Sequence, residues 1–201
     1  MQTRQPSRPP LNITIAYLNI GGLYSKATPL SDWMKEKSID AVLLSETKAS
    51  AFSTNLINAQ LLAPYRFLSL VDGGAVNIPQ LIGPKNNPRI SRGLGIVYNP
   101  LVVSVTSLPP LVDFSPATFP ICPLAWVQIV PALERRSKFR LRACVAYFPP
   151  KLDRQKFSMH LHSMVASIES HQLLCKPEET LLVGGDFNAH LPGYRLEGPP
   201  W

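Results

Sequence analysis

The sequence lacks long apolar runs, and none of them reaches the about 18 residues that a membrane-spanning helix needs. No signal-peptide core follows Met1, so we expect no secretory leader. Cysteine is scarce as well: there are three, without metal-type spacing, namely Cys122, Cys144 and Cys175. An odd number of widely spaced cysteines argues against a disulfide framework, and we interpret them as reduced thiols of an intracellular protein.

Charged residues are also few. They make up 16% of the chain, while hydrophobic residues make up 45%, which is typical of a globular protein rather than a disordered one. A length of 201 residues fits one domain with a core of its own. Proline is the exception, because its 21 residues are about twice the usual share, and this predicts many loops and few long helices.

Acidic residues are outnumbered by basic ones, and the formal net charge is +7. This excess favours a polyanionic partner, with nucleic acid as the first candidate, and plain solubility as the alternative. We predict a flexible basic Pro-rich arm over residues 1–11, a domain over residues 12–190 and a C-terminal tail over residues 191–201.

A long exposed loop is predicted from Val71 to Arg92, because the segment is rich in Gly, Pro and Asn. It carries three basic residues, Lys85, Arg89 and Arg92. These side chains either contact a phosphate backbone or are merely solvated, and the sequence does not separate the two.

The helices are predicted from caps and apolar spacing. Thr28 fits an N-cap and Pro29 the first helical position of one helix. A second helix is predicted from Asp153 to about Leu174, with apolar residues three to four apart. We expect the histidines of this helix to lie on the surface: His160, His162 and His171.

The strands are predicted from apolar runs and alternation. Residues 125–130 and 139–148 predict an antiparallel pair, and residues 65–70 a single strand. Residues 93–99 and 102–106 are close in sequence and predict a hairpin. Between Ala51 and Arg92 the pattern is otherwise weak.

One strand end carries three polar groups in close succession. Residues 181–183 predict a short buried strand, and two glycines follow, which allow a tight turn or close approach to a ligand. Asp186, Asn188 and His190 come next. A carboxylate and an amide here can hold a hard cation or orient a water. The alternative is an Asx turn in which Asp186 and Asn188 cap their own backbone.

Three other predicted strands also end in polar groups. Asn19 follows an apolar strand and precedes two glycines, and Glu46 directly follows the apolar run of residues 41–44. Tyr147 lies shortly before Pro149. The alternatives are a turn residue for Asn19, a solvated strand end for Glu46 and simple aromatic packing for Tyr147.

These four stretches together resemble the endonuclease/exonuclease/phosphatase family, the DNase-I-like phosphodiesterases. Gly185-Asp186-Phe187-Asn188 is similar to the family's Gly-Asp-Phe-Asn box, and the Ala189-His190 that follows looks most like the endonuclease domains of LINE-type (non-LTR) retrotransposons. The boxes at Asn19, Glu46, Tyr147 and Asp186 occur in the family's order. Each box is short, but four in order at domain-scale spacing are specific.

The resemblance implies an α/β (α+β) fold, a four-layer α/β/β/α sandwich with the active site at one end of the two sheets. It implies a Mg²⁺-dependent (or Mn²⁺-dependent) phosphodiesterase that nicks DNA and is nuclear if active. Glu46 and Asn19 are then the metal ligands, Asp186 activates a water that Asn188 orients, and Tyr147 contacts the phosphate.

The sequence departs from the family in two places. Ser45 stands where a Gln often precedes the metal-binding Glu. The family's last box, an Asp-His pair, is missing, since no Asp-His dipeptide occurs in the chain. We therefore expect a C-terminally truncated domain with an incomplete second sheet and weak or no activity. His190 is the accessory residue to test as a replacement.

Two alternatives stay open. One is an inactive fragment that binds nucleic acid through counterion release. The other is a phosphoesterase of the same fold that acts on a phosphoinositide or another phosphoester outside nucleic acid.

Overall fold

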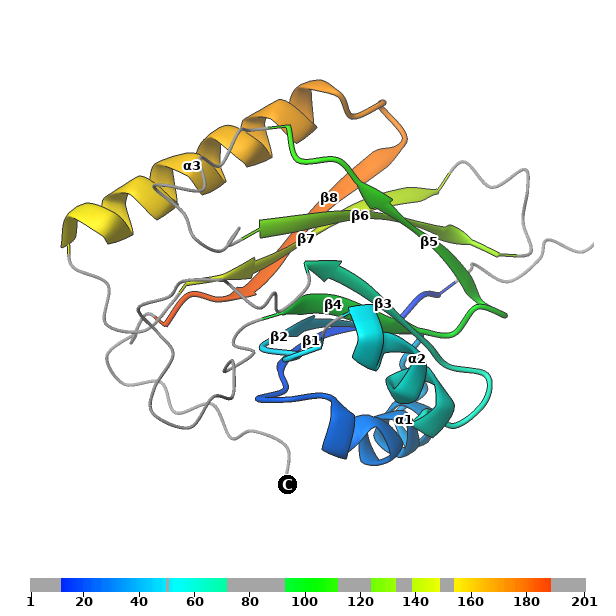
Figure 1. Ribbon diagram of the computed structural model, residues 1–201. Coiled ribbons are helices and arrows are strands. Elements are labelled where there is room, and N and C mark those ends of the chain that lie inside the picture. Colours follow the sequence, from blue (N-terminus) through cyan, green and yellow to red (C-terminus); the bar gives the residue numbers. More distant parts are fainter. Residues whose placement is uncertain are drawn as a thin grey trace, which may run out of the picture.

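A computed structural model describes residues 12–49, 51–71, 93–111, 124–132, 139–148 and 154–188 (Figure 1). Eight strands, three α-helices and a short 3-10 helix follow one another in these ranges. Their order is β1 (Ile15–Asn19), η1 (Tyr24–Lys26), α1 (Ala27–Glu36), β2 (Ala41–Ser45), α2 (Ala51–Gln60), β3 (Arg66–Val71), β4 (Leu94–Tyr98), β5 (Val103–Leu108), β6 (Leu124–Pro131), β7 (Arg140–Tyr147), α3 (Arg154–Leu173) and β8 (Glu179–Asp186).

The first sheet has the strand order β1-β2-β4-β3. β1 and β2 are parallel, with Asn19 opposite Ser45, and helix α1 makes the crossover between them. β4 is antiparallel to both of its neighbours, β2 and β3. Because β1 and β2 are parallel, they end at the same edge of this sheet.

The second sheet has the strand order β5-β6-β7-β8. β6 is antiparallel to both β5 and β7. β8 follows the crossover helix α3 and is parallel to β7. Tyr147 and Asp186, the last residues of β7 and β8, are paired in register. No strand pairs with the outer edge of β8 in the described part of the chain.

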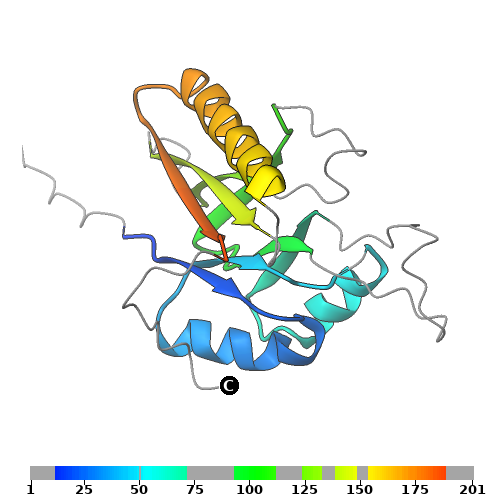
Figure 2. The same ribbon diagram turned by 90° about the vertical axis from the view of Figure 1, so that its left-hand side faces the viewer.

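Three apolar clusters separate four layers, which Figures 1 and 2 show as helix, sheet, sheet and helix. The first cluster lies between the first sheet and helices α1 and α2, the second between the two sheets, and the third between the second sheet and α3. The predicted α/β/β/α sandwich is therefore confirmed.

Alternating burial explains how β2 joins two of these clusters. All of its five residues are buried. Val42 and Leu44 pack toward the helices, while Ala41 and Leu43 pack toward the second sheet. Successive side chains of a strand point to opposite faces, so a strand that is apolar on both faces belongs between two layers.

The predicted hairpin of residues 93–106 is wrong. Both edges of β4 are occupied by β2 and β3, and β5 pairs with β6 in the other sheet. The chain turns at Asn99, whose carbonyl accepts the backbone N–H groups of Val102 and Val103. Alternation predicted the strands correctly, but it does not specify a partner.

The predicted N-cap at Thr28 is also wrong. α1 begins at Ala27, directly after η1, and the hydroxyl of Thr28 donates instead to the carbonyl of Gln60 at 2.9 Å. The antiparallel pair β6–β7, the strand β3 and the helix α3 are confirmed close to their predicted bounds. α2 was not predicted, because its sequence has little amphipathic pattern.

Two of the three helix histidines lie in the interior, contrary to expectation. His171 and His160 are buried, and His162 alone of the three is exposed. The ring of His171 stacks on Trp126 with centroids 4.0 Å apart, and the ring of His160 packs edge-on against Phe148. Sequence spacing failed here because the buried face of α3 is rotated from the one that its aliphatic residues indicate: Leu161 and Val165 are exposed, while Met164 and Ile168 pack on the same side as the two histidines.

The predicted arm and C-terminal tail lie outside the described residues, and so does the predicted basic loop except for Val71, which ends β3. Among the described helices, none is long and apolar enough to cross a membrane.

Candidate active site at the shared end of the two sheets

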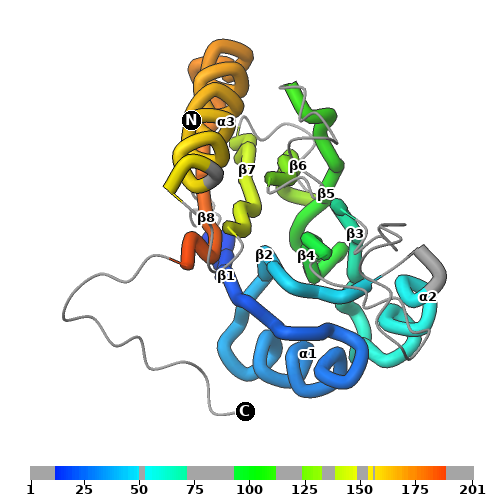
Figure 3. The backbone as a smooth tube through the Cα atoms, turned by 60° about the vertical axis from the view of Figure 1, so that its left-hand side comes forward, coloured from blue at the N-terminus to red at the C-terminus, as the bar shows by residue number. Residues whose placement is uncertain are grey.

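The strands that carry the candidate residues end at one place. Asn19 ends β1, Glu46 follows β2, and Tyr147 and Asp186 end β7 and β8. Figure 3 shows the end of β8 beside β1, so the two sheets meet here. Each sheet contributes one parallel pair, and parallel strands finish at the same edge.

Asn19 and Asp186 are in direct contact across the two sheets. The side-chain amide of Asn19 donates to Oδ2 of Asp186 at 2.7 Å, and its carbonyl oxygen accepts the N–H of Gly21 at 3.1 Å. Oδ1 of Asp186 accepts the N–H of Asn188 at 3.0 Å. The Asx turn that was the alternative interpretation for Asp186 is thus present. The other carboxylate oxygen of Asp186 contacts Asn19 in the first sheet.

Glu46 and Tyr147 form a second contact between the sheets. The hydroxyl of Tyr147 donates to Oε1 of Glu46 at 2.7 Å. The tyrosine is buried, and the glutamate is half-buried. Glu46 has a φ of 53°, a left-handed conformation that costs a non-glycine residue energy and is often found at functional sites. Tyr147 therefore orients Glu46 in this structure.

Asn188 connects β8 to the end of β7. It also has a left-handed φ, of 46°, and its side-chain amide donates to the carbonyl of Phe148. The N–H of Phe148 in turn donates to the carbonyl of Asp186 at 2.8 Å. The amide nitrogen of Asn188 is thus occupied by the backbone, and its Oδ1 is the atom left to orient a water.

The two glycines before Asp186 do not make a turn, as β8 continues through both of them. A Cβ on Gly185 would come within 2.6 Å of the carbonyl oxygen and 2.7 Å of the Cβ of Ala146 on β7. A Cβ on Gly184 would meet Tyr17 at an ordinary 3.5 Å. Gly185 is required by close strand packing, and of the two options that the sequence offered for these glycines the tight turn is excluded.

Tyr17 and Ser45 belong to the same region and were missed in the sequence. The hydroxyl of Tyr17 donates to Oγ of Ser45 at 2.6 Å, and Ser45 is fully buried. Burial raises the pKa of Tyr17, and the charges of Asp186 and Glu46 add to the rise, while hydrogen bonds to Ser45 and to the backbone of Asp186 oppose it. The phenol stays protonated and remains a donor. The signal was the alternation that puts Tyr17 on the same strand face as Asn19.

The donors present fit a hard divalent cation. Mg²⁺ prefers oxygen ligands and usually takes one or two carboxylates together with water. Glu46 has a second carboxylate oxygen, and the carbonyl oxygen of Asn19 has a second lone pair. The described residues contain no group of three or more His, Cys, Asp or Glu side chains that could hold a metal ion.

Four predicted residues lie outside the described residues: Lys85, Arg89, Arg92 and His190. The other five predicted residues are brought together, and their chemical roles stay predictions.

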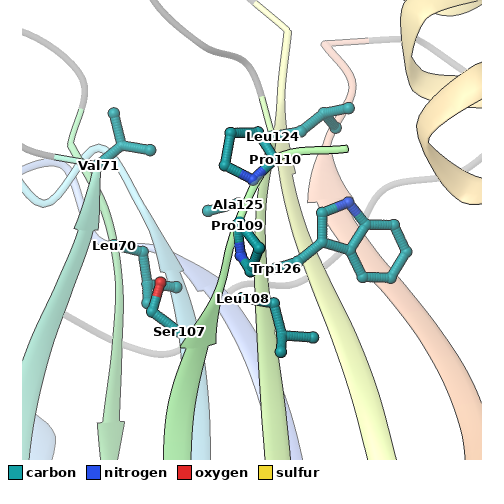
Figure 4. A pocket seen from close by; sticks show the side chains of 9 residues that line it. All are labelled: Leu70, Val71, Ser107, Leu108, Pro109, Pro110, Leu124, Ala125 and Trp126. Carbon is teal, nitrogen blue, oxygen red and sulfur yellow. The ribbon is translucent and has the colours of Figure 1, made fainter. Parts of the chain in front are cut away.

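A cavity of about 480 Å³ lies at the same end of the sandwich, beside the outer strands (Figure 4). Val71 ends β3, Leu108 ends β5 and Leu124 begins β6, and the antiparallel pairings bring these termini to the end where β2 and β7 finish. The indole of Trp126 points toward α3, where Nε1 donates to Ser167 at 2.9 Å. The lining is mainly aliphatic and includes none of the candidate site residues.

No family model and no curated protein sequence matches the chain. Solved structures do. The D. rerio TDP2 complexed with a single-strand DNA product is 14% identical, with a TM-score of 0.55 over 89% of this chain and 61% of that one. The human Nocturnin catalytic domain with bound sulfate is 13% identical, with a TM-score of 0.56 over 89% of this chain and 64% of that one.

A mannosyl-6-phosphatase from Bacteroides thetaiotaomicron is similar to the same degree: 12% identity and a TM-score of 0.56 over 88% of this chain and 66% of that one. The chain thus spans less than two thirds of the length of these structures. At such identities the likeness establishes the fold, which is the DNase-I-like sandwich of endonucleases, exonucleases and phosphatases.

Proposed function

We propose that the protein is a divalent-metal-dependent phosphodiesterase that acts on DNA, with Mg²⁺ or Mn²⁺ as its ion. One observation supports this most: residues far apart in sequence form two polar contacts, Asn19–Asp186 and Tyr147–Glu46, at one end of a DNase-I-like sandwich. A packing role alone does not require an amide, two carboxylates and a phenol at four strand ends.

Each residue has a role that its contacts suggest. A bound cation supplies positive charge that stabilises the phosphoryl oxygens in the transition state. Glu46, oriented by Tyr147, and the carbonyl oxygen of Asn19 would hold that cation. Asp186 is fixed by hydrogen bonds to both of its oxygens, so it can polarise a water in a defined direction. Oδ1 of Asn188 would orient the same water.

DNA is the substrate that the chain's own properties favour. The net charge of +7 attracts a polyanion, and the Asp186–His190 stretch resembles LINE-type endonucleases, from which we propose a retrotransposon origin and a nuclear location. The structural neighbours themselves differ, as one is complexed with single-strand DNA and another is a sugar phosphatase. A small phosphoester is therefore the alternative substrate.

A second candidate function is nucleic-acid binding without catalysis. The observation in its favour is that the sequence contains no Asp-His dipeptide. Groups that act as a catalytic unit lose most of their effect when one member is absent, so weak activity is expected unless His190 replaces the missing histidine.

Plasmid nicking with Mg²⁺ against EDTA tests the proposal. We expect slow Mg²⁺-dependent nicking that Asp186→Ala removes. Asp32→Ala is the matched control, because Asp32 is an exposed aspartate on α1 and it should leave nicking unchanged. DNA binding without Mg²⁺-dependent nicking by the wild type would instead identify a binding protein. Hydrolysis of a small phosphodiester without any action on DNA would support the alternative substrate.

A further inference from the structure

Tyr17 lies between the two halves of the candidate site. It belongs to β1 in the first sheet, and its neighbours are Ser45 on β2 and Gly184 on β8 in the second sheet. We propose that Tyr17 is a positioning residue that holds Glu46 and Asp186 at their working separation through these two neighbours. This inference rests on the proposed function and goes beyond the residues that the family resemblance assigns.

The contact with Ser45 acts on the metal-binding side of the site. Ser45 is fully buried and directly precedes Glu46. Glu46 has a left-handed backbone, so it depends on its surroundings to stay in place. The hydrogen bond of 2.6 Å from the phenol of Tyr17 fixes the hydroxyl of Ser45, the residue before Glu46. The next residue, Thr47, is held by its backbone N–H, which donates to Gly93 at 2.9 Å.

The contact with Gly184 acts on the side of the water. A Cβ placed on Gly184 would lie 3.5 Å from the Cβ and 3.6 Å from Cδ2 of Tyr17, so the ring covers this glycine. Gly184 is two residues before Asp186 on the same strand. The aromatic ring therefore limits how closely β8 can approach β1. It thereby also sets the distance between Asp186 on β8 and Asn19 on β1, which are joined by a hydrogen bond.

The sequence explains why a tyrosine is needed. The residue before Glu46 is Ser45, which has a short side chain. A serine hydroxyl ends close to its own backbone, so its partner must reach across from the neighbouring strand. Tyr17 and Ser45 lie on the same face of two paired strands, offset by two residues, because Asn19 is opposite Ser45. An aromatic side chain spans such a diagonal.

Tyr17→Phe tests the inference, because it keeps the ring on Gly184 and removes the hydroxyl from Ser45. The readout is the Mg²⁺ concentration that gives half of the maximal increase in melting temperature, together with kcat and KM for nicking. We expect that Mg²⁺ concentration to rise roughly tenfold, as for other residues that orient a metal ligand. We also expect kcat to fall while KM for DNA stays the same, since Tyr17 contacts no substrate.

Two further variants separate positioning from general stability. Ser45→Ala removes the other partner and should reproduce the effect, and the double variant should be no worse than either single one. Tyr98→Phe is the matched control: Tyr98 is a half-buried tyrosine packed between the sheets, on β4 and at the opposite end of the sandwich, and it should change neither readout.

The outcomes distinguish this inference from the proposed function. If the wild type responds to Mg²⁺ and Tyr17→Phe and Ser45→Ala respond equally, Tyr17 only packs and the inference is overturned alone. The same conclusion follows if Tyr98→Phe weakens the Mg²⁺ response as much as Tyr17→Phe does. If the wild type itself shows neither a Mg²⁺ response nor hydrolysis, the proposed function fails and the inference fails with it.

Discussion

The side-chain amide of Asn19 donates a hydrogen bond of 2.7 Å to the carboxylate of Asp186, which lies 167 residues further along the chain. One partner ends the first strand of the first sheet and the other ends the last strand of the second. This contact fixes the carboxylate from outside its own strand. An Asx turn alone, the second contact of Asp186, would fix only its other oxygen.

Asn19→Ala is therefore expected to lower the rate of metal-dependent nicking about 10- to 100-fold, because a misplaced catalytic group can cost that much. The double variant with Asp186→Ala should be no slower than Asp186→Ala alone, since the two side chains act as one unit. Single-turnover nicking rates measure both effects. Additive losses from the two substitutions would show that Asn19 acts independently of Asp186.

Glu46 is expected to carry the response to metal. Mg²⁺ that binds the folded state should stabilise the wild type by about 2.7 kcal/mol at a concentration of 100 times Kd. Glu46→Gln keeps the shape of the side chain but removes its charge, so it should abolish the shift in melting temperature. Glu178→Gln, an exposed glutamate, is the control and should respond like the wild type. An unchanged Mg²⁺ response in Glu46→Gln would remove Glu46 as the ligand.

The two glycines of β8 should differ sharply in their tolerance of alanine. Gly185→Ala places a Cβ against the backbone of Ala146, which cannot move without shifting β7, so we expect a loss of about 1–3 kcal/mol. Gly184→Ala makes only an ordinary contact with Tyr17 and should cost less. Urea unfolding of both variants measures the difference. Equal stability of the two would contradict the close packing of β8 on β7.

His171 is expected to weaken the fold in acid. Burial, with the nearby charge of Arg142, lowers its pKa to about 4, so the folded protein resists protonation of a ring that the unfolded chain protonates near pH 6.5. The unfolded state binds more protons in this window, so the free energy of unfolding decreases as the pH falls from 6.5 to 4. The loss is on the order of 2–3 kcal/mol.

His171→Phe keeps an aromatic ring on Trp126 and removes this titration. Melting temperatures between pH 4 and 7 should therefore fall less steeply for this variant than for the wild type. The control is His162→Gln, which alters an exposed histidine of the same helix and should follow the wild-type profile. A wild-type slope in His171→Phe would assign the acid sensitivity to other groups.

The sequence predicted where strands end better than which strands pair. Asn19, Glu46 and Asp186 each follow an apolar run, and a run that stops at a polar residue indicates the rim of a sheet. The pairing of β5 with β6 rather than β4 depends on a turn at Asn99 and on edges that are already occupied. Such competition between strands is decided by the whole fold.

The residues that the sequence missed are those that look like core. Tyr17 lies in an apolar strand and has a hydrophobic ring, so only its place on the same strand face as Asn19 distinguishes it from a packing residue. Its hydrogen bond to Ser45 depends on the register of β1 and β2. His171 was misplaced for a related reason, because its surroundings come from Trp126 on a strand of the second sheet.

The division of the chain between the sheets has a consequence for how the protein can be taken apart. Every strand of the first sheet lies before residue 99, and every strand of the second lies after residue 102. The Asn19–Asp186 and Glu46–Tyr147 contacts therefore join an N-terminal half to a C-terminal half. Neither half holds a complete set of candidate groups, so two separately produced fragments would regain metal-dependent hydrolysis only by associating. Metal-dependent hydrolysis by such a split pair would therefore report that the two β-sheets have associated.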